Sequence, residues 1–139
     1  MLSNYRVLDL TDERGHFAGQ LLAALGAEVI AVEPPGGMRA RQLGPFVGDR
    51  PDPEGSLSHF AANRGKRSVV LDLTDAAKEH IAREGYDPVY GARPLKRAIQ
   101  QRIENPLSKL ILQGKFGPKD VIPVQVDAAG EFQFGRTVH

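Results

Sequence analysis

Two groups of residues in this 139-residue sequence have the chemistry to bind phosphate. The first is the stretch NRGKRS, in which Asn63, Lys66 and Arg67 bring together one amide and two cations. The second is Arg93, which stands directly before Pro94 at the start of a predicted helix. A guanidinium group forms forked hydrogen bonds to phosphate, and the start of a helix adds a favourable dipole. Both groups are also compatible with an ordinary solvated surface.

Several classes of function are excluded by what the sequence lacks. It has no cysteine, which rules out disulfides, thiolate zinc sites and thiol nucleophiles and fits a cytoplasmic location. It contains neither G-x-x-x-x-G-K-[ST] nor an acidic Walker B strand, so it has no phosphate cradle and no Mg²⁺ site for nucleotide hydrolysis. A net charge of +1 and short apolar runs argue against nucleic-acid and membrane partners. We expect no enzyme activity and no required cofactor.

The first part of the chain is predicted to form a βαβ unit. Arg6–Leu10 is a short β-type run, and AEVIAVE is a second one that ends at Pro34. Between them, Phe17, Leu21, Leu22 and Leu25 share one helical face, and Gly26 follows as a helix stop. Such units build parallel sheets. No G-x-G-x-x-G is present in the first strand-to-helix turn, so a dinucleotide fingerprint is absent.

The segment 36–62 is rich in Gly, Pro and charged residues and is predicted to be a long loop, with a helical turn at Leu57–Ala62. Loops of this length are either functional surfaces or poorly ordered.

The second part is predicted to be a compact α+β domain. Thr74 is a good N-cap for a helix that ends at Gly85 and whose inward-facing residues are expected to be Ala77, Ile81 and Ala82. A second helix begins at Pro94 and is expected to break or restart at Asn105-Pro106; its core stripe is Leu95, Ile99 and Ile103. The runs DVIPVQV and EFQFG alternate like strands, and DAAG is the turn between them. We expect Val69–Leu73 to join this pair as a third strand rather than complete the amino-terminal sheet.

The stretches RVLDLT, FAGQLLAALGAEVIAVEPPGG, GPF and FAANRGKRSVVLDL resemble, in order, the amino-terminal segment of the class III (CaiB/BaiF) CoA-transferases over residues 4–73. The resemblance implies part of a Rossmann-like domain that binds coenzyme A. It implies CoA contacts for Asn63, Lys66 and Arg67, and weakly for Arg14. The family's catalytic aspartate lies beyond this segment, so no aspartate of this chain takes that role, Asp72 included.

From residue 71 to residue 139 the sequence resembles the carboxy-terminal small domain of the Clp-type AAA+ disaggregase chaperones of the ClpB type. The stretch GYDPVYGARPLKRAIQ is the most specific part of this pattern. In that family the domain caps the second ATPase module and packs on the neighbouring subunit of a ring. The resemblance implies that Arg93 is the sensor-2 arginine, which touches the γ-phosphate of ATP.

These patterns together predict an α/β protein in two parts: a partial βαβ segment at 1–68 and a small domain with a three-stranded sheet at 69–139. The expected function is a non-catalytic AAA+ small-domain module for subunit contact and nucleotide sensing. Its partners would be AAA+ subunits or copies of itself, with weak binding of ATP, ADP or coenzyme A. The alternatives are a CoA-binding fragment and a chimera without selected function. A natural fusion, an engineered chimera and a gene-assembly artefact all fit the junction in VVLDLTD.

Overall fold

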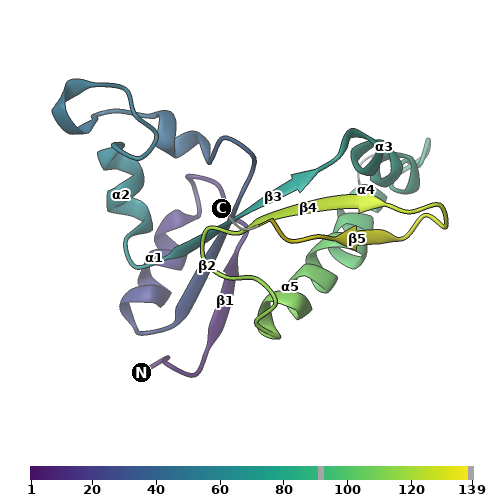
Figure 1. The fold of residues 1–139 in the computed structure, drawn as a ribbon, viewed down its shortest axis with the longest axis horizontal. Helices are drawn as coiled ribbons and strands as arrows, with labels where there is room; N and C mark the ends of the chain where they lie inside the picture. Colours follow the sequence, from purple (N-terminus) through teal and green to yellow (C-terminus); the bar gives the residue numbers. More distant parts are fainter. Residues whose placement is uncertain (91–92, 138–139) are drawn as a thin grey trace. The chain divides into compact units, whose positions relative to one another are not determined.

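The computed structural model describes residues 1–90 and 93–137, and the side chain of Arg93 lies outside the described part. The chain divides into two compact units, Met1–Val70 and Leu71–His139, which we describe separately. Hydrogen-bonded neighbours follow the strand order β1-β2-β3-β4-β5, and helices accompany the strands in both units (Figure 1). The fold is therefore mixed α/β.

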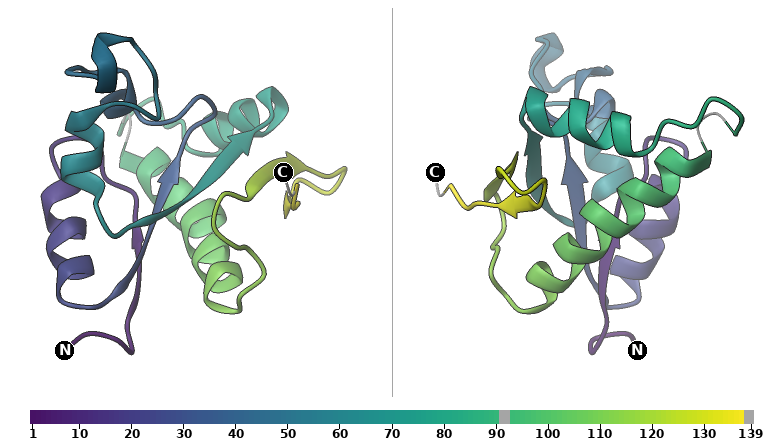
Figure 2. Two further views of the ribbon diagram at one scale, coloured as in Figure 1. Left: turned by 60° about the vertical axis from the view of Figure 1, so that its left-hand side comes forward. Right: turned by 90° about the vertical axis from the view of Figure 1, so that its right-hand side faces the viewer.

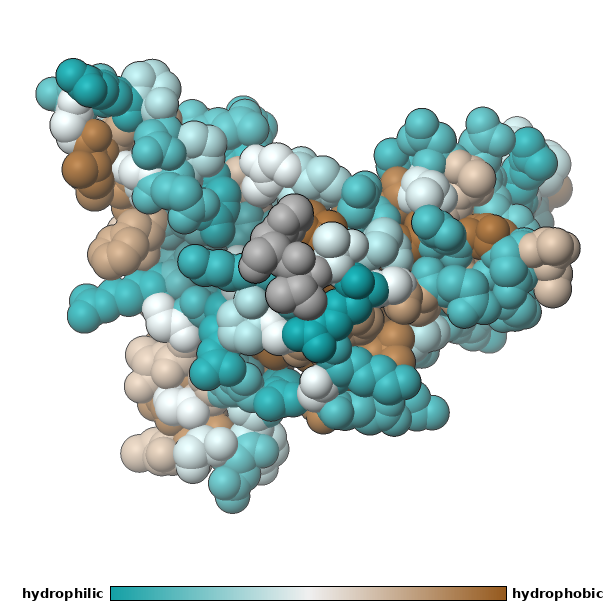
Figure 3. Space-filling view, in the orientation of Figure 1, coloured by the Kyte–Doolittle hydropathy of each residue, from teal (hydrophilic) through white to brown (hydrophobic). Residues whose placement is uncertain are grey.

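The first unit begins with a parallel βαβ arrangement. Strand β1 (Arg6–Asp9) pairs with β2 (Glu28–Glu33), so that Asp9 lies opposite Ala31. Helix α1 (His16–Ala24) connects them and buries His16 and Gly19. The apolar face recognised in the sequence is turned outward instead, since Phe17, Leu21 and Leu25 are exposed. The surface over α1 is correspondingly tan to brown in Figure 3.

The segment expected to be a long loop contains short helices. These are the 3-10 helices η1 (Arg39–Gln42) and η2 (Val47–Asp49), and they are followed by α2 (Leu57–Asn63). Ser56 is the buried N-cap of α2 and accepts from the backbone N–H of His59. Its hydroxyl lies 2.9 Å from the carbonyl oxygen of Ala40 and 2.6 Å from that of Leu43, which ties η1 to α2.

Strand β3 (Arg67–Leu73) corrects one expectation. Its first four residues pair in parallel with β2, with Arg67 opposite Ile30 and Val70 opposite Glu33. Beyond its carboxyl end, the N–H of Thr74 donates to the carbonyl of Val124 at 3.0 Å. The strand does neighbour β4, as predicted, but the prediction that it would not complete the amino-terminal sheet was wrong. One five-stranded sheet therefore replaces the expected separate three-stranded one. The strand has seven residues, which divide between the two units. Residues 67–70 pair with β2, and Leu71 and Leu73 pack against the core of the second unit.

The second unit consists of helices around a small apolar core. Its elements are α3 (Asp75–Glu84), α4 (Arg93–Ile99), η3 (Gln100–Glu104), α5 (Asn105–Leu112), β4 (Val121–Val126) and β5 (Phe132–Phe134). Thr74 caps α3 as predicted, accepting from the N–H of Ala77 at 3.3 Å. The core comprises Ile81, Ala98 and Ile103, packed against Leu71, Leu73, Leu95, Ile99, Phe132 and Phe134.

At Asn105-Pro106 the helix restarts and does not break, since α5 begins at Asn105 directly after η3. Figure 2 shows α4, η3 and α5 as one continuous helical rod in green. The stretch η3 is a π-helix, whose turn is wider than that of an α-helix. Pro106 has no N–H and crowds the carbonyl of the preceding turn, and a wider turn gives its ring room. The helix therefore continues, and Leu107 and Ile111 are buried beyond it.

A polar pocket in the first unit

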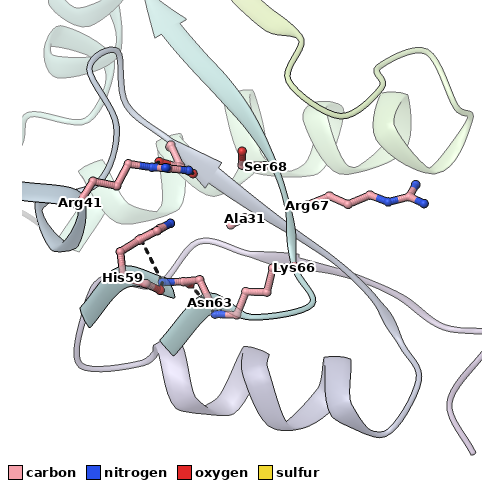
Figure 4. Close-up of a pocket in the computed structure, with 8 residues that line it drawn as sticks. Ala31, Arg41, His59, Asn63, Lys66, Arg67 and Ser68 are labelled. Carbon is pink, nitrogen blue, oxygen red and sulfur yellow. Dashed lines mark hydrogen bonds and ion pairs between the residues drawn. The ribbon is translucent and has the colours of Figure 1, made fainter. Parts of the chain in front are cut away.

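A small cavity of about 50 Å³ lies in the first unit and is lined mainly by polar side chains (Figure 4). It lies among β2, η1, α2 and the start of β3, and its walls are Ala31, Glu33, Arg41, His59, Asn63, Lys66, Arg67 and Ser68. Asn63, Lys66 and Arg67, which the sequence put forward, thus line one site.

Lys66 is the most enclosed cation of this pocket, and 2% of its side chain is exposed. It follows Gly65, whose φ of 82° turns the chain between α2 and β3. Its ammonium group donates to Asp9 at 2.7 Å, to the carbonyl of His16 at 2.9 Å and to the side-chain oxygen of Asn63 at 2.9 Å. An ammonium has three hydrogens, so protein groups occupy all its donors.

Asp9 is the counter-ion of Lys66 and is equally buried. Besides Lys66, its carboxylate accepts from the N–H of Thr11 at 3.0 Å and from the Thr11 hydroxyl at 2.6 Å. Burial opposes ionisation, but the hydrogen bonds from Lys66 and Thr11 outweigh it and hold the pKa of Asp9 below its ordinary value. Asp9 therefore stays ionised at neutral pH.

Gly19 of α1 makes room for this ion pair. A Cβ atom at position 19 would stand 2.3 Å from Asp9 Oδ2 and 2.9 Å from Lys66 Nζ. The first distance is far below any real contact of a Cβ atom, so any larger residue would displace the pair. The helix approaches the pocket closely because position 19 has no side chain.

A second buried ion pair joins β2 to η1. The guanidinium of Arg41 donates to Glu33 through Nε at 2.6 Å and through Nη2 at 2.8 Å, and the N–H of Met38 donates to the same carboxylate at 3.1 Å. Burial acts against the charge of Glu33, yet these donors lower the pKa of its carboxyl. Arg41 also reaches the exposed Glu54 at 2.9 Å.

Asn63 joins two histidines. Its Nδ2 lies 3.2 Å from Nδ1 of His16 and 3.2 Å from Nδ1 of His59, and Figure 4 shows the bond to His59 as a dashed line. The same nitrogen lies 3.1 Å from the carbonyl of His59. The orientation of the amide is fixed by Lys66, which can only donate and therefore must face the amide oxygen.

Both histidines are held neutral by their surroundings. Burial is the main cause that lowers the pKa of His16, and the positive charge of Lys66 adds to it. Burial also lowers the pKa of His59, with Arg41 as the neighbouring cation. His16 is 1% exposed, and its Nε2 atom has no hydrogen-bond partner among the described residues.

The remaining predicted site residues lie apart from this network. Arg67 is 57% exposed, forms an ion pair with Glu28 at 2.8 Å and points away from the other labelled side chains (Figure 4). Arg14 is exposed on the loop before α1, where its guanidinium lowers the pKa of Asp12 to about 2. Arg93 begins α4 in the second unit, and its side chain lies outside the described residues.

Sequence reasoning missed Asp9, His16, Glu33, Arg41 and His59. A signal existed for two of them, because Asp9 and Glu33 end apolar strands, where a charged residue needs a partner. The histidines gave no such signal. In the part of the chain that the structure describes, no cluster of His, Cys, Asp or Glu is arranged to hold a metal ion. No described helix has the length and apolar character needed to span a membrane.

This arrangement is a closed polar network. Each buried cation has a carboxylate partner, so the interior offers no free charge to a ligand. The cation on its rim, Arg67, is the group that solvent can reach.

Comparison with protein families gives two matches. Residues 2–84 match CoA-transferase family III, and residues 56–124 match the C-terminal, D2-small domain of ClpB protein. The two matched ranges share residues 56–84, which include α2, β3 and α3. The composite character predicted from the sequence is confirmed.

Individual relatives agree with this division. Chaperone protein ClpB 1 of Thermosynechococcus vestitus is 50% identical over 72 residues, which cover 52% of this chain and 8% of that protein. Chaperone protein ClpB of Vibrio cholerae is 51% identical over 70 residues, which cover 50% of this chain and 8% of that protein. The chain thus spans a small fraction of the curated relatives that it matches.

A crystal structure of the hypothetical protein Rv3272 from Mycobacterium tuberculosis is similar at 42% identity with a TM-score of 0.44. That match covers 60% of this chain and 22% of the solved chain. The chain belongs to CoA-transferase family III through residues 2–84, and its residues 56–124 match the D2-small domain of the chaperone ClpB.

Proposed function

We propose that this chain is a non-catalytic protein whose second unit serves as an AAA+ small-domain module, contacting a neighbouring subunit and sensing its nucleotide. The similarity to the D2-small domain of ClpB supports the kind of module. Because the sequence has no phosphate-binding loop, the proposal places the ATP on a partner subunit. Arg93, the first residue of α4, is the proposed sensing residue.

The core of the second unit supports a module that keeps its shape. Its apolar side chains come from β3, α3, α4, η3 and β5. Gly85 allows the end of α3 to lie close to α4, since it has no side chain. A Cβ atom at this position would stand 2.4 Å from Cα of Leu95. A domain packed in this way can present a fixed surface to a partner.

The observation that carries the proposal is a set of exposed apolar side chains just before α4. Tyr86, Val89 and Tyr90 are 73%, 80% and 68% exposed. The N–H groups of Val89 and Tyr90 donate to the carboxylate of Asp87 at 2.7 and 3.0 Å, which holds this segment as a turn. Aromatic side chains of this kind are enriched in protein interfaces. Covering them with a neighbouring subunit would also bring that subunit near Arg93.

The test is sedimentation velocity with a Vibrio cholerae ClpB that has been cut before its D2-small domain. We expect the chain to co-sediment with it in the presence of ATP. Changing Tyr86, Val89 and Tyr90 together to serine should weaken the complex about tenfold or more, because interface aromatics carry much of the binding energy. Tyr5→Ser is the matched control, since Tyr5 is an exposed tyrosine of the first unit. Equal binding of the triple variant would refute the contact surface.

A second proposal is binding of coenzyme A by the first unit. The match to CoA-transferase family III favours it, and Arg67 on the pocket rim is the exposed cation suited to a phosphate. Lys66 would not contact the phosphate directly, since its three hydrogens are bonded to protein groups. It would instead hold the turn before β3 in place, next to Arg67. Arg14, also exposed, is a further proposed contact. Asn63, whose amide is bonded to Lys66 and to the histidines, would contribute as Lys66 does, by holding the turn in shape.

Calorimetric titration with coenzyme A and, separately, with ATP distinguishes the two proposals. If the second holds, coenzyme A binds and Arg67→Ala weakens it about tenfold, the effect of losing one charge-assisted bond. Arg83→Ala is the control, because Arg83 is an exposed arginine of α3 with a surface ion pair. Absence of heat with coenzyme A at millimolar concentration would remove the second proposal.

A further inference from the structure

A hydrogen-bonded group of side chains connects α1 to α2, and its two histidines have no role in either proposed function. It consists of His16 at the start of α1 and His59 and Asn63 on α2. Nδ1 of each ring lies 3.2 Å from Nδ2 of Asn63.

The orientation of the Asn63 amide limits where the two rings can carry a proton. The oxygen of Asn63 faces the ammonium of Lys66 at 2.9 Å, so its NH₂ group faces the histidines. An amide NH₂ donates and cannot accept, so a ring nitrogen that accepts from it is unprotonated. The NH₂ group has two hydrogens and also lies 3.1 Å from the carbonyl of His59, so it serves two of these three acceptors at a time. A proton on the Nδ1 atom of a ring that accepts from the amide would set two donors against each other.

We propose that His16, Asn63 and His59 form an acid-sensitive latch, which holds α2 against α1 at neutral pH and releases it in mild acid. A proton on His16 would add a second buried cation beside Lys66, and among the described residues Asp9 is the buried counter-ion of both. Asp12 and Glu13, on the loop before α1, also face His16. They are exposed and therefore weakly compensating.

The charged groups around His59 are of both signs. Arg41 and His16 oppose a proton on its ring, and Glu33 and Glu54 favour one. Glu33 is committed to Arg41 by two hydrogen bonds, and Glu54 is exposed. One bond between the helices does not depend on pH, since Gln20 Nε2 donates to the carbonyl of Ala61 at 2.6 Å. The latch is therefore expected to loosen α2 without unfolding the unit.

Amide hydrogen exchange of α2 at pH 7.5 and pH 5.5, corrected for the intrinsic exchange rate, tests the latch in the full chain. The protection of α2 should fall by up to about tenfold for each histidine, because the ordinary pKa of histidine, 6.5, lies one unit above the lower pH. His80→Gln, which changes a histidine of the second unit, should leave this fall unchanged. No fall in the natural chain would overturn the proposal.

Asn63→Asp gives the opposite arrangement, because a carboxylate accepts from a protonated Nδ1. In this variant the protection of α2 should stay constant or rise on acidification, whereas a merely structural asparagine predicts the same fall as in the natural chain. If Asn63→Asp does not fold, His59→Gln provides the same decision. In His59→Gln, the protection of α2 should decrease between pH 7.5 and pH 5.5 only by the amount that His16 causes. A decrease as large as in the natural chain would overturn the latch.

Discussion

Lys66 donates a hydrogen bond of 2.7 Å to the carboxylate of Asp9, and the two side chains are 2% and 3% exposed. The bond spans 57 positions of the sequence and joins the end of β1 to the turn before β3. A residue whose type suggests a phosphate ligand thus serves as a buried structural cation.

Lys66→Met is expected to lower the free energy of unfolding by about 3–5 kcal/mol, because it leaves the carboxylate of Asp9 buried without a counter-ion. Urea unfolding followed by circular dichroism measures the change. Glu79→Gln, which removes an exposed ion pair of α3, should change stability by no more than about 0.5 kcal/mol.

Removing both members of the pair should be less harmful than removing one. The double variant Asp9→Leu, Lys66→Met is expected to be more stable than Lys66→Met alone, since no buried charge then remains. Additive losses in the double variant would contradict a direct interaction between the two residues.

Gly19→Ala is expected to destabilise the protein by about 1–3 kcal/mol, although alanine is the better helix former. The reason is the 2.3 Å approach of the new Cβ atom to Asp9 Oδ2. Thermal unfolding of the variant measures it. Ala18→Gly, at an exposed position of the same helix, should cost about 1 kcal/mol by propensity alone. A stabilising effect of Gly19→Ala would show that the helix does not approach the ion pair so closely.

Acidification should weaken the first unit below the ordinary carboxyl pKa values. The folded-state pKa of Asp9 and of Glu33 is lowered from 3.8 and 4.5, so the unfolded chain binds protons more readily than the folded one. Their contribution is therefore complete above these values and is lost as the pH falls below them. The free energy of unfolding at pH 6, 5, 4 and 3 measures this dependence. Asp9→Asn combined with Glu33→Gln should flatten it, and an equally steep curve would assign the acid sensitivity to other groups.

Gly85→Ala tests the packing of the second unit. The new Cβ atom would stand 2.4 Å from the backbone Cα of Leu95, which cannot rotate away as a side chain can. We expect a loss of about 1–3 kcal/mol in the unfolding of the second unit. Ala82→Ser, at an exposed position of α3, is the control and should change little. Wild-type stability of Gly85→Ala would contradict the close packing of α3 on α4.

Most of the fold could be predicted because local chemistry determines it. Thr74 caps α3, and the core-facing stripe of the next helical stretch consists of Leu95, Ile99 and Ile103. Both patterns depend only on residues a few positions apart in the sequence. The double pairing of β3 depends on partners 37 residues earlier and some 50 later, and no local pattern reports it. The π-helix before Pro106 escaped for a related reason, since proline rules assume an ordinary α-helical turn.

The sequence indicated three residues of the pocket. Asn63, Lys66 and Arg67 of NRGKRS line it, and their contact with coenzyme A stays a prediction. The sequence could not indicate that Lys66 points inward, because that depends on Asp9 and on the absence of a side chain at Gly19. His16 and His59 are single histidines 43 positions apart, and only α2 folding on α1 brings both to Asn63.

The most direct test of the central proposal is ATP hydrolysis measured for the chain alone, for a ClpB cut before its D2-small domain, and for the two mixed. The chain alone should give no turnover above the blank, because it has no phosphate-binding loop. The mixture should turn over ATP faster than the cut ClpB alone, and Arg93→Ala should abolish the gain. Turnover by the chain alone, or no gain in the mixture, would contradict a non-catalytic AAA+ small-domain module.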